Sequence, residues 1–331
     1  MTQIERLEVV DTTRYPSFFV SFEIKDCWNT METVVQAALD DVIQKCTKPG
    51  TRERKRALYM HDNPAGNLFA LSFGLCEAER LAFVVRYLNY LCIIDDVLED
   101  LPHKESVIEH EILSQVLHLG PPSSPPLGYT PNTRHDYISY LRDMKDEMMI
   151  VDPVRTPALL ERLEEGLRVR ESSDADFNNI DEYVPYRLHN FDYDTVSRLM
   201  LWAMDIDISP EQLDSDLLSK VKYSTGVIGS LSNDYFSWER EKLQHGSDVS
   251  RIRNAVGVLM KQHDISEAEA KAEVKSIIIK EENNVKSLVE HCEEMSPAVK
   301  RYLEGLQTFA GGYGFWCATC PRYSRPKGDS S

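Results

Sequence analysis

Two acidic pairs lie close together in the first half of the chain, in the run DDVLED that begins at Asp95 and ends at Asp100. An α-helix turns by about 100° per residue, so Asp95 and Glu99 share one face and Asp96 and Asp100 share the next. Carboxylate oxygens are the ligands that Mg²⁺ prefers, and its remaining positions go to water and substrate phosphate. The run therefore predicts a magnesium site, with a solvated acidic helix end as the alternative.

A second row of oxygen-bearing side chains lies downstream, in the segment NDYFSWEREK. Asn233, Ser237 and Glu241 are spaced four residues apart, which places an amide, a hydroxyl and a carboxylate on one helical face over two turns. Together these groups are suited to one metal ion. The alternative is the polar outer face of an amphipathic helix. Neighbouring apolar residues such as Val227 and Leu231 instead predict that this helix packs deeply, where polar groups need partners.

An aspartate-rich DDxx(D/E) motif followed by NDxxSxxxE resembles the two metal-binding motifs of class I terpene synthases from fungi and bacteria. The resemblance implies an all-α fold, a class I terpenoid synthase α-helical bundle around a central active-site cavity. It implies three Mg²⁺ ions that hold the diphosphate of an isoprenyl substrate. Asp95 and Glu99 would bind metal on one side, and Asn233, Ser237 and Glu241 on the other.

Two basic segments extend the resemblance over nearly the whole chain. The arginine of YVPYR, Arg187, matches the family's diphosphate sensor and would act in catalysis, and CPRY matches a terminal element in which Arg322 and Tyr323 bind diphosphate. Lys242 follows the triad where a basic residue is common in the family. Related enzymes often carry Asp three residues after the sensor. This chain has Asn190 there, which can accept a hydrogen bond from arginine but adds no charge.

These segments together are similar to the N-terminal cyclase domains of fungal bifunctional terpene synthases, which make diterpenes or sesterterpenes. We expect residues 1–323 to form the cyclase domain and residues 324–331 to be a disordered tail or the start of a linker. The partner prenyltransferase domain of that family is missing from this sequence. An excised domain and a natural stand-alone enzyme both remain open.

The elements that position these motifs are predicted to be helices, because apolar residues recur at spacings of three and four with little strand-like alternation. The clearest stripe runs from Leu81 to Ile94 and leads directly into the acidic run, so we expect this helix to be buried. The other patterned segments are Thr33 to Ile43, Tyr137 to Met149, Leu159 to Val169, Tyr193 to Met204, Leu217 to Trp238, Ile252 to Gln262 and Ser266 to Met295.

Two breaks interrupt these patterns. The proline-rich segment Gly120 to Asn132 is predicted to be a long surface loop, with a domain linker as the alternative. The segment Gln244 to Ser250 follows the second motif and is predicted to be a mobile flap over the site.

Composition limits the partners of the chain. The formal net charge of −17 argues against nucleic acid, which is normally bound by clustered Lys and Arg. The one basic cluster, Arg52 to Arg56, is interpreted as a solvated loop or helix start, with a diphosphate contact as the minor alternative. An acidic protein that binds an anion needs metal ions or a local basic lining.

The N-terminus lacks a secretory signal and no segment is apolar enough to span a membrane. Seven scattered cysteines are typical of a reduced protein, so we expect a cytoplasmic one. A homodimer is left open, since dimers are common among helical terpene cyclases.

A cyclase passes positive charge through carbon, so its pocket should be dry and lined with aromatic rings. Trp316 matches an aromatic position in the relatives and is the first candidate for substrate contact. Phe69, Phe191 and Trp202 are weaker candidates, because an aromatic residue on a helix is more often plain core.

The hypothesis is a magnesium-dependent terpene synthase, a carbon-oxygen lyase acting on phosphates, that cyclises an isoprenyl diphosphate to a polycyclic hydrocarbon. Geranylgeranyl diphosphate is the first substrate candidate, geranylfarnesyl diphosphate the second and farnesyl diphosphate the third. The rivals are a chain-elongating prenyltransferase, which normally carries two aspartate-rich motifs, and a non-catalytic helical scaffold.

Overall fold

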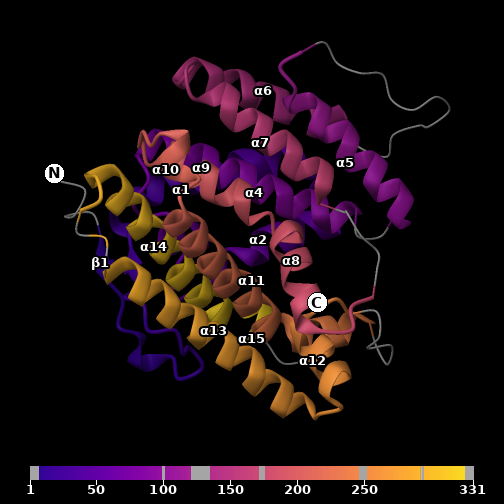
Figure 1. The fold of residues 1–331 in the computed structure, drawn as a ribbon. Coiled ribbons are helices and arrows are strands. Elements are labelled where there is room, and N and C mark those ends of the chain that lie inside the picture. The colour runs from indigo at the N-terminus through magenta and orange to yellow at the C-terminus, as the bar shows by residue number, and fades with distance from the viewer. Residues whose placement is uncertain are drawn as a thin grey trace.

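The computed structural model describes residues 7–98, 101–120, 135–170, 176–245, 252–290, 292 and 294–324. Over these residues the chain is a helical bundle, as expected (Figure 1). The strands are two residues long: β1 (Glu8–Val9) pairs antiparallel with β2 (Lys25–Asp26). A short 3-10 helix, Thr12–Arg14, lies between them.

The helices are numbered in chain order. They are α1 (Trp28–Cys46), α2 (Arg52–Met60), α3 (Leu68–Ser72), α4 (Ala78–Leu98), α5 (His103–Leu117), α6 (His135–Val151), α7 (Thr156–Val169), α8 (Ile180–Asn190), α9 (Tyr193–Ala203), α10 (Pro210–Leu213), α11 (Asp216–His245), α12 (Ala255–His263), α13 (Glu267–Glu290), α14 (Pro297–Thr319) and α15 (Pro321–Ser324).

Two groups of helices enclose α4. Helices α5, α6 and α7 pack on one another at one side, and α11, α13 and α14 pack together at the other (Figure 1). Helix α4 contacts α1, α2 and α9. Most of its side chains are buried, which confirms the prediction for this stripe, and three of its partly exposed residues, Leu88, Cys92 and Asp95, share one face. That face therefore leads to the acidic run.

The predicted helix boundaries differ from the observed ones mainly at their ends. Helix α11 continues past Trp238 to His245, so the first two residues of the predicted flap belong to this helix, and residues 246–250 lie outside the described part. Of the proline-rich segment, only Gly120 is described. The predicted tail also falls almost entirely outside the described residues, which end at Ser324.

The patterned segments did not include the shorter helices α2, α3, α8, α10 and α15 or the longer helices α5 and α14. In α14 the glycines weaken local helix propensity, but one of them permits a close tertiary contact. A Cβ built on Gly312 would lie 2.0 Å from the carbonyl oxygen of Leu71 on α3, so only glycine lets α3 and α14 approach this closely. Ser296 caps the helix by accepting a hydrogen bond from the amide of Val299, and Pro297 starts it.

A sharp turn separates α8 from α9. Its last residue, Asp192, adopts the left-handed conformation, with φ of 55° and ψ of 43°. A non-glycine residue at positive φ is uncommon, and aspartate is among the residues that tolerate it. The turn therefore fixes the positions of Asn190, Phe191 and Asp192 between the two helices.

No helix in the described part of the chain is long and apolar enough to cross a membrane.

Candidate active site

Arg187 lies at the centre of the site, on α8, and its guanidinium donates to three side chains. Nε donates to Asp234 Oδ1 at 2.9 Å, Nη1 to Asn190 Oδ1 at 2.7 Å, and Nη2 to Asn233 Oδ1 at 2.8 Å. Burial alone would lower the pKa of Arg187, but the Asp234 carboxylate together with Tyr183, Glu241 and Tyr313 outweighs burial, and the pKa is raised. The arginine therefore stays charged, and the amide of Asn190 serves as its acceptor where relatives often have a carboxylate.

Both polar atoms of the Asn233 side chain form hydrogen bonds. Its Nδ2 donates to the hydroxyl of Tyr323 at 2.8 Å and to that of Tyr313 at 3.2 Å, while its Oδ1 accepts from Arg187. Tyr323 comes from α15 and Tyr313 from α14. Helix α8, helix α11 and the C-terminal segment α14–α15, which are far apart in the sequence, thus meet at one amide.

Ser237 and Glu241 follow Asn233 along the same face of α11, as the spacing predicts. The hydroxyl of Ser237 donates to Glu241 Oε1 at 2.5 Å, and Nδ2 of Asn254 donates to Oε2 at 3.1 Å. Burial raises the pKa of Glu241 above its ordinary value, while these two hydrogen bonds oppose the rise. The first residue of α12 also holds α11 in place, since the amide of Ala255 donates to Asp234 Oδ2 at 3.0 Å.

Asp95 is held by an arginine that the sequence analysis did not single out. Arg170, next to the C-terminal end of α7, donates from Nη2 to Oδ2 at 2.6 Å and from Nε to Oδ1 at 3.0 Å. The arginine is well covered, with 14% of its side chain exposed, whereas 41% of the Asp95 side chain is exposed. Glu99 and Asp100 lie outside the described residues.

Asp96 points elsewhere and is buried. Arg56 on α2 donates to its Oδ1 at 2.8 Å, and Arg52 donates to its backbone carbonyl at 2.9 Å. The basic cluster that was interpreted as a solvated loop or helix start is therefore part of a helix packed against the acidic run. This contact brings positive charge to the end of α4.

Arg240 and Arg322 complete a basic lining. The two lie close enough that each arginine's charge acts on the other: burial, followed by Arg322, lowers the pKa of Arg240. Arg240 makes no hydrogen bond or ion pair with any residue in the described ranges. Nε of Arg322 is buried and, within the same ranges, lacks a hydrogen-bond partner. Two partly buried cations with unused donors make a place for an anion.

The structure does not bring Lys242 to this lining. Its ammonium group binds Glu267 Oε2 at 2.6 Å and Glu239 Oε2 at 3.0 Å, on the side of α11 that faces α13. The basic residue of the second motif that faces the site is Arg240, two positions earlier. Helical phase separates the two, because a shift of two residues turns the side chain by about 200°.

Aromatic rings pack beside the Asn233 junction. Trp316 is buried and its ring lies 6.0 Å from that of Tyr313 and 5.9 Å from that of Tyr323. Phe191 packs edge-on against Tyr313 at 5.3 Å, and the guanidinium of Arg187 lies 5.6 Å from its ring centroid. Trp316 and Phe191 therefore both adjoin the polar end of the site.

Two other aromatic candidates lie farther from this junction. Phe69 stacks on His61 at 5.7 Å. Trp202 packs on Phe83, with Arg80 over its ring at 4.6 Å, near the start of α4. Phe83 precedes Asp95 by a helical distance of about 18 Å at a rise of about 1.5 Å per residue. Trp202 therefore lies toward the opposite end of α4 from the acidic run.

The donor set fits a hard divalent cation. Among the described residues, no three His, Cys, Asp or Glu side chains gather as a metal site on their own. The row on α11 instead combines one carboxylate, one hydroxyl and one amide oxygen, and Asp95 adds a partly exposed carboxylate. Mg²⁺ is typically bound by one or two carboxylates and completed by water and phosphate oxygens, so these residues suit it when phosphate is present.

Two site residues had no signal in the sequence motifs: Arg170 and Asn254 reach the site from a helix end and a turn whose packing the sequence alone does not reveal. Arg56 belongs to the basic cluster for which a diphosphate contact was the minor alternative. Arg240 was within the second motif, and its helical phase relative to Asn233 and Glu241 was the available clue.

The fold and the site define a class I terpene synthase, and comparisons with known proteins agree. The family model described as "Terpene synthase family 2, C-terminal metal binding" matches residues 86–284, more than half of the chain. The chain therefore belongs to this terpene synthase family, which makes it a lyase and, from the family's metal-binding region, an enzyme that uses divalent metal.

The chain is similar to fungal terpene synthases. Sesterterpene synthase btcA of Colletotrichum orbiculare is 28% identical over 269 residues, which cover 79% of this chain and 37% of that protein. Ophiobolin F synthase oblA of Cochliobolus heterostrophus is 31% identical over 183 residues, or 54% of this chain and 24% of that protein. The matched part of the chain thus spans between about a quarter and a little over a third of the length of these relatives, and it resembles their cyclase domains.

Solved structures support the fold. The crystal structure of aristolochene synthase from Penicillium roqueforti superposes with a TM-score of 0.68 at 20% sequence identity, covering 86% of this chain and 94% of that one.

Proposed function

We propose that this terpene cyclase is magnesium-dependent, that it ionises a linear geranylgeranyl or geranylfarnesyl diphosphate, and that it closes the resulting carbocation into a polycyclic hydrocarbon. We also propose that residues 1–323 act as one cyclase domain. The observation that carries the proposal is the junction at Asn233, where the arginine of YVPYR and the tyrosine of CPRY bind the first residue of the triad.

In this proposal Asp95 and Glu99 hold metal on one side, and Asn233, Ser237 and Glu241 hold it on the other. Three Mg²⁺ ions, when bound, would neutralise the diphosphate and make it a good leaving group. Arg187, Arg240 and Arg322 would bind the diphosphate oxygens and stabilise the charge that develops as the carbon-oxygen bond breaks. Ionisation then requires no protein nucleophile.

At the hydrocarbon part of the substrate, the reaction depends on exclusion of water from the carbocation. Trp316, Tyr313 and Phe191 adjoin the diphosphate end, where aromatic faces attract the cation and displace solvent. The partly exposed face of α4, with Leu88 and Cys92, supplies a wall for the hydrocarbon chain. The chain's residues would thus bind the leaving group firmly and leave the carbocation to fold against apolar surfaces.

The substrate's length stays a proposal. Geranylgeranyl diphosphate remains the first candidate. The name of the Colletotrichum relative, a sesterterpene synthase, favours geranylfarnesyl diphosphate, so both belong in the same experiment. These relatives are longer than this chain. In a longer protein that contained this chain, a prenyltransferase domain would supply the isoprenyl diphosphate.

The test is incubation of the purified chain with farnesyl, geranylgeranyl and geranylfarnesyl diphosphates, each with Mg²⁺ or with chelator, followed by mass spectrometry of the hexane extract. We expect a magnesium-dependent cyclic hydrocarbon from one of the two longer substrates. Longer diphosphates formed in the presence of isopentenyl diphosphate would instead indicate a prenyltransferase. Full turnover by Asn233→Ala would contradict the role of the triad.

A further inference from the structure

A buried carboxyl group beside the site has no part in the mechanism above. Asp192 is 6% exposed, it sits in the left-handed turn between α8 and α9, and its side chain does not cap α9. Its Oδ2 has no hydrogen-bond partner among the described residues. A buried carboxylate oxygen without a hydrogen-bond donor lowers the stability of the folded protein, so its presence indicates a role that offsets this cost.

Asp192 lies within reach of the arginine that holds Asp95. A Cβ built on Gly166 of α7 would lie 2.6 Å from both Asp192 carboxylate oxygens, which places this carboxyl group directly over Gly166. Arg170 follows Gly166 by four residues, one turn along the same helical face. Helical side chains point back toward the helix N-terminus, so the side chain of Arg170 covers the turn that contains Gly166.

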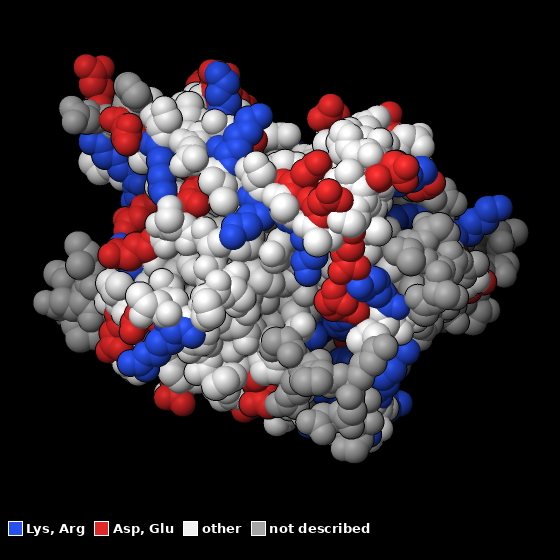
Figure 2. Space-filling view, turned by 90° about the horizontal axis from the view of Figure 1, so that it is seen from below, with Lys and Arg blue, Asp and Glu red and all other residues white. Residues whose placement is uncertain are grey.

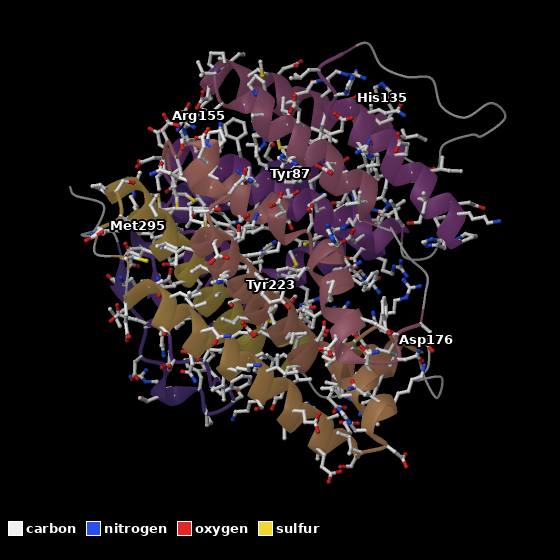
Figure 3. All side chains as sticks on the ribbon, in the orientation of Figure 1. Tyr87, His135, Arg155, Asp176, Tyr223 and Met295 are labelled. Carbon is white, nitrogen blue, oxygen red and sulfur yellow. The ribbon has the colours of Figure 1, made fainter. Side chains whose placement is uncertain are left out.

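Tyr87 belongs to the same cluster. It is fully buried on α4, is labelled in Figure 3, and its hydroxyl has no hydrogen-bond partner in the described part of the chain. Burial raises the pKa of Tyr87, Asp192 adds to the rise and Arg170 opposes it, so the three groups act on one another electrostatically. The interior near Arg170 therefore offers one carboxylate oxygen of Asp192 and the hydroxyl of Tyr87, neither of which has a hydrogen-bond partner among the described residues while Arg170 binds Asp95.

We propose that Arg170 pairs with Asp95 only in the metal-free enzyme. When a divalent cation binds Asp95, the guanidinium of Arg170 moves to the carboxylate of Asp192. Asp192 is then a positioning residue, which accepts the displaced guanidinium and so makes metal binding at the aspartate-rich motif easier. This inference rests on the proposed function, because it requires Asp95 to bind metal.

In this structure the Asp192 carboxyl group does not form a close ion pair with Arg170. Burial raises the pKa of Asp192 to about 7, although Arg170 and Thr195 oppose the rise. A carboxylate already in a close bidentate pair with arginine would have a depressed pKa instead. Burial lowers the pKa of Arg170, but Asp95, together with Asp192 and Cys92, outweighs burial and the pKa is raised. The guanidinium of Arg170 is paired with Asp95 in this structure.

The transfer would also connect the two halves of the site. Asn190, which binds Arg187, and Asp192 lie on either side of Phe191 in the same turn. When Arg170 moves to Asp192, the turn that supports the diphosphate sensor gains an ion pair. Metal at Asp95 would therefore stabilise the position of Arg187 without any direct contact between the two.

The test is the calorimetric Kd of inorganic pyrophosphate at a fixed concentration of free Mg²⁺, measured for wild type, Asp192→Asn, Arg170→Gln and the double variant. Asparagine keeps the volume and tolerates the left-handed conformation. We expect Asp192→Asn to weaken binding by about tenfold, within the range of costs for leaving a buried hydrogen-bonding group without its partner. Arg170→Gln should bind at least as tightly as wild type, because the cation that competes with metal is gone.

The double variant separates this role from a merely structural one. If Asp192 acts through Arg170, adding Asp192→Asn to Arg170→Gln changes Kd by less than about twofold, since the pair is coupled. The matched control is Asp205→Asn, at an aspartate with the same φ of 55° that pairs with Arg155 toward the far end of α4, and this change should leave Kd unchanged.

Gly166→Ala is a second route, because its methyl group would displace the Asp192 carboxylate and should weaken binding as Asp192→Asn does. Equal loss from Asp192→Asn with and without Arg170 would overturn the inference, as would an Asp192→Asn variant that binds like wild type. If wild type shows no magnesium-dependent binding of pyrophosphate, the proposed function itself fails and the inference fails with it.

Discussion

The polar residues of the site are joined through a few shared atoms. The Arg187 guanidinium uses all of its donor nitrogens on the Asp234 carboxylate and on the amides of Asn190 and Asn233. Such a planar fork cannot be replaced by the single ammonium group of lysine. Each of these groups is positioned by another, so the geometry offered to a diphosphate is prepared before the ligand arrives.

At this scale, Arg240 and Lys242 make a matched pair of substitutions. We expect Arg240→Ala to raise the Kd of pyrophosphate by about tenfold, because a partly buried guanidinium next to the anion is lost. Lys242→Ala should change it by less than about threefold, since the ammonium group is bound to Glu267 and Glu239, and exposed ion pairs contribute little. Calorimetry at fixed Mg²⁺ compares the two. Equal losses would mean that Lys242 reaches the ligand.

His61 predicts a loss of stability in acid. Burial lowers the pKa of His61 to about 4, with Arg322 adding to the effect, whereas the unfolded chain takes up this proton near 6.5. The unfolded state therefore binds more protons below 6.5, and the free energy of unfolding falls as pH drops from 6.5 toward 4, by up to about 3 kcal/mol.

Urea unfolding across this pH range would measure the effect. His61→Gln, which keeps a donor for Asn89 but does not titrate, should flatten this part of the pH profile. An unchanged acid slope in this variant would assign the loss to other groups.

At the scale of elements, the site depends on helices that approach closely. Helix α14 contacts both α11 and α3, and it carries Tyr313 and Trp316 to the Asn233 junction. The approach to α3 requires a residue without a side chain at position 312, since backbone atoms of Leu71 occupy the space of a Cβ. The packing of the helix, more than its local propensity, keeps it in register with the site.

Gly312→Ala is therefore expected to lower the free energy of unfolding by about 3 kcal/mol or more, at the upper end of overpacking costs. The control is Gly314→Ala in the same helix, where a Cβ would lie at 3.4 Å from Ser232 Oγ, an ordinary contact. This control should be close to neutral, because alanine is the better helix former. Urea titration of both variants measures the difference.

At the scale of the whole molecule, an acidic protein binds an anionic substrate. The net charge is −17, and the face shown in Figure 2 carries basic and acidic side chains next to one another, with no continuous basic surface among the described residues. Attraction for diphosphate must therefore come from the local lining of arginines and from metal ions. Neither is visible in the overall charge.

We expect pyrophosphate and Mg²⁺ together to raise the Tm by several degrees, because a ligand that binds only the folded state stabilises it by about 2.7 kcal/mol at a hundredfold excess over Kd. Pyrophosphate with chelator should give little or no rise, since the carboxylates near the site then repel it. Thermal unfolding followed by circular dichroism distinguishes these cases. An equal rise with chelator would show that the arginines suffice without metal.

The helical patterning and the motifs were informative in the sequence. The stripe from Leu81 to Ile94, the acidic run after it and the row on α11 all depend on the period of the α-helix. This period is a local property, since it follows from the spacing of residues that are close in the sequence. For the same reason, the common face of Asn233, Ser237 and Glu241 could be predicted from residue spacing alone, and the basic segments matched a known family.

Tertiary structure decided which charges meet. Arg240 rather than Lys242 faces the site because α13 covers the other side of α11, and Arg170 reaches Asp95 because the end of α7 packs near the end of α4. Asp192 faces Gly166 because a turn in the left-handed conformation directs it there. These contacts join residues far apart in the chain, so their energies depend on packing and burial, which helical periodicity does not encode.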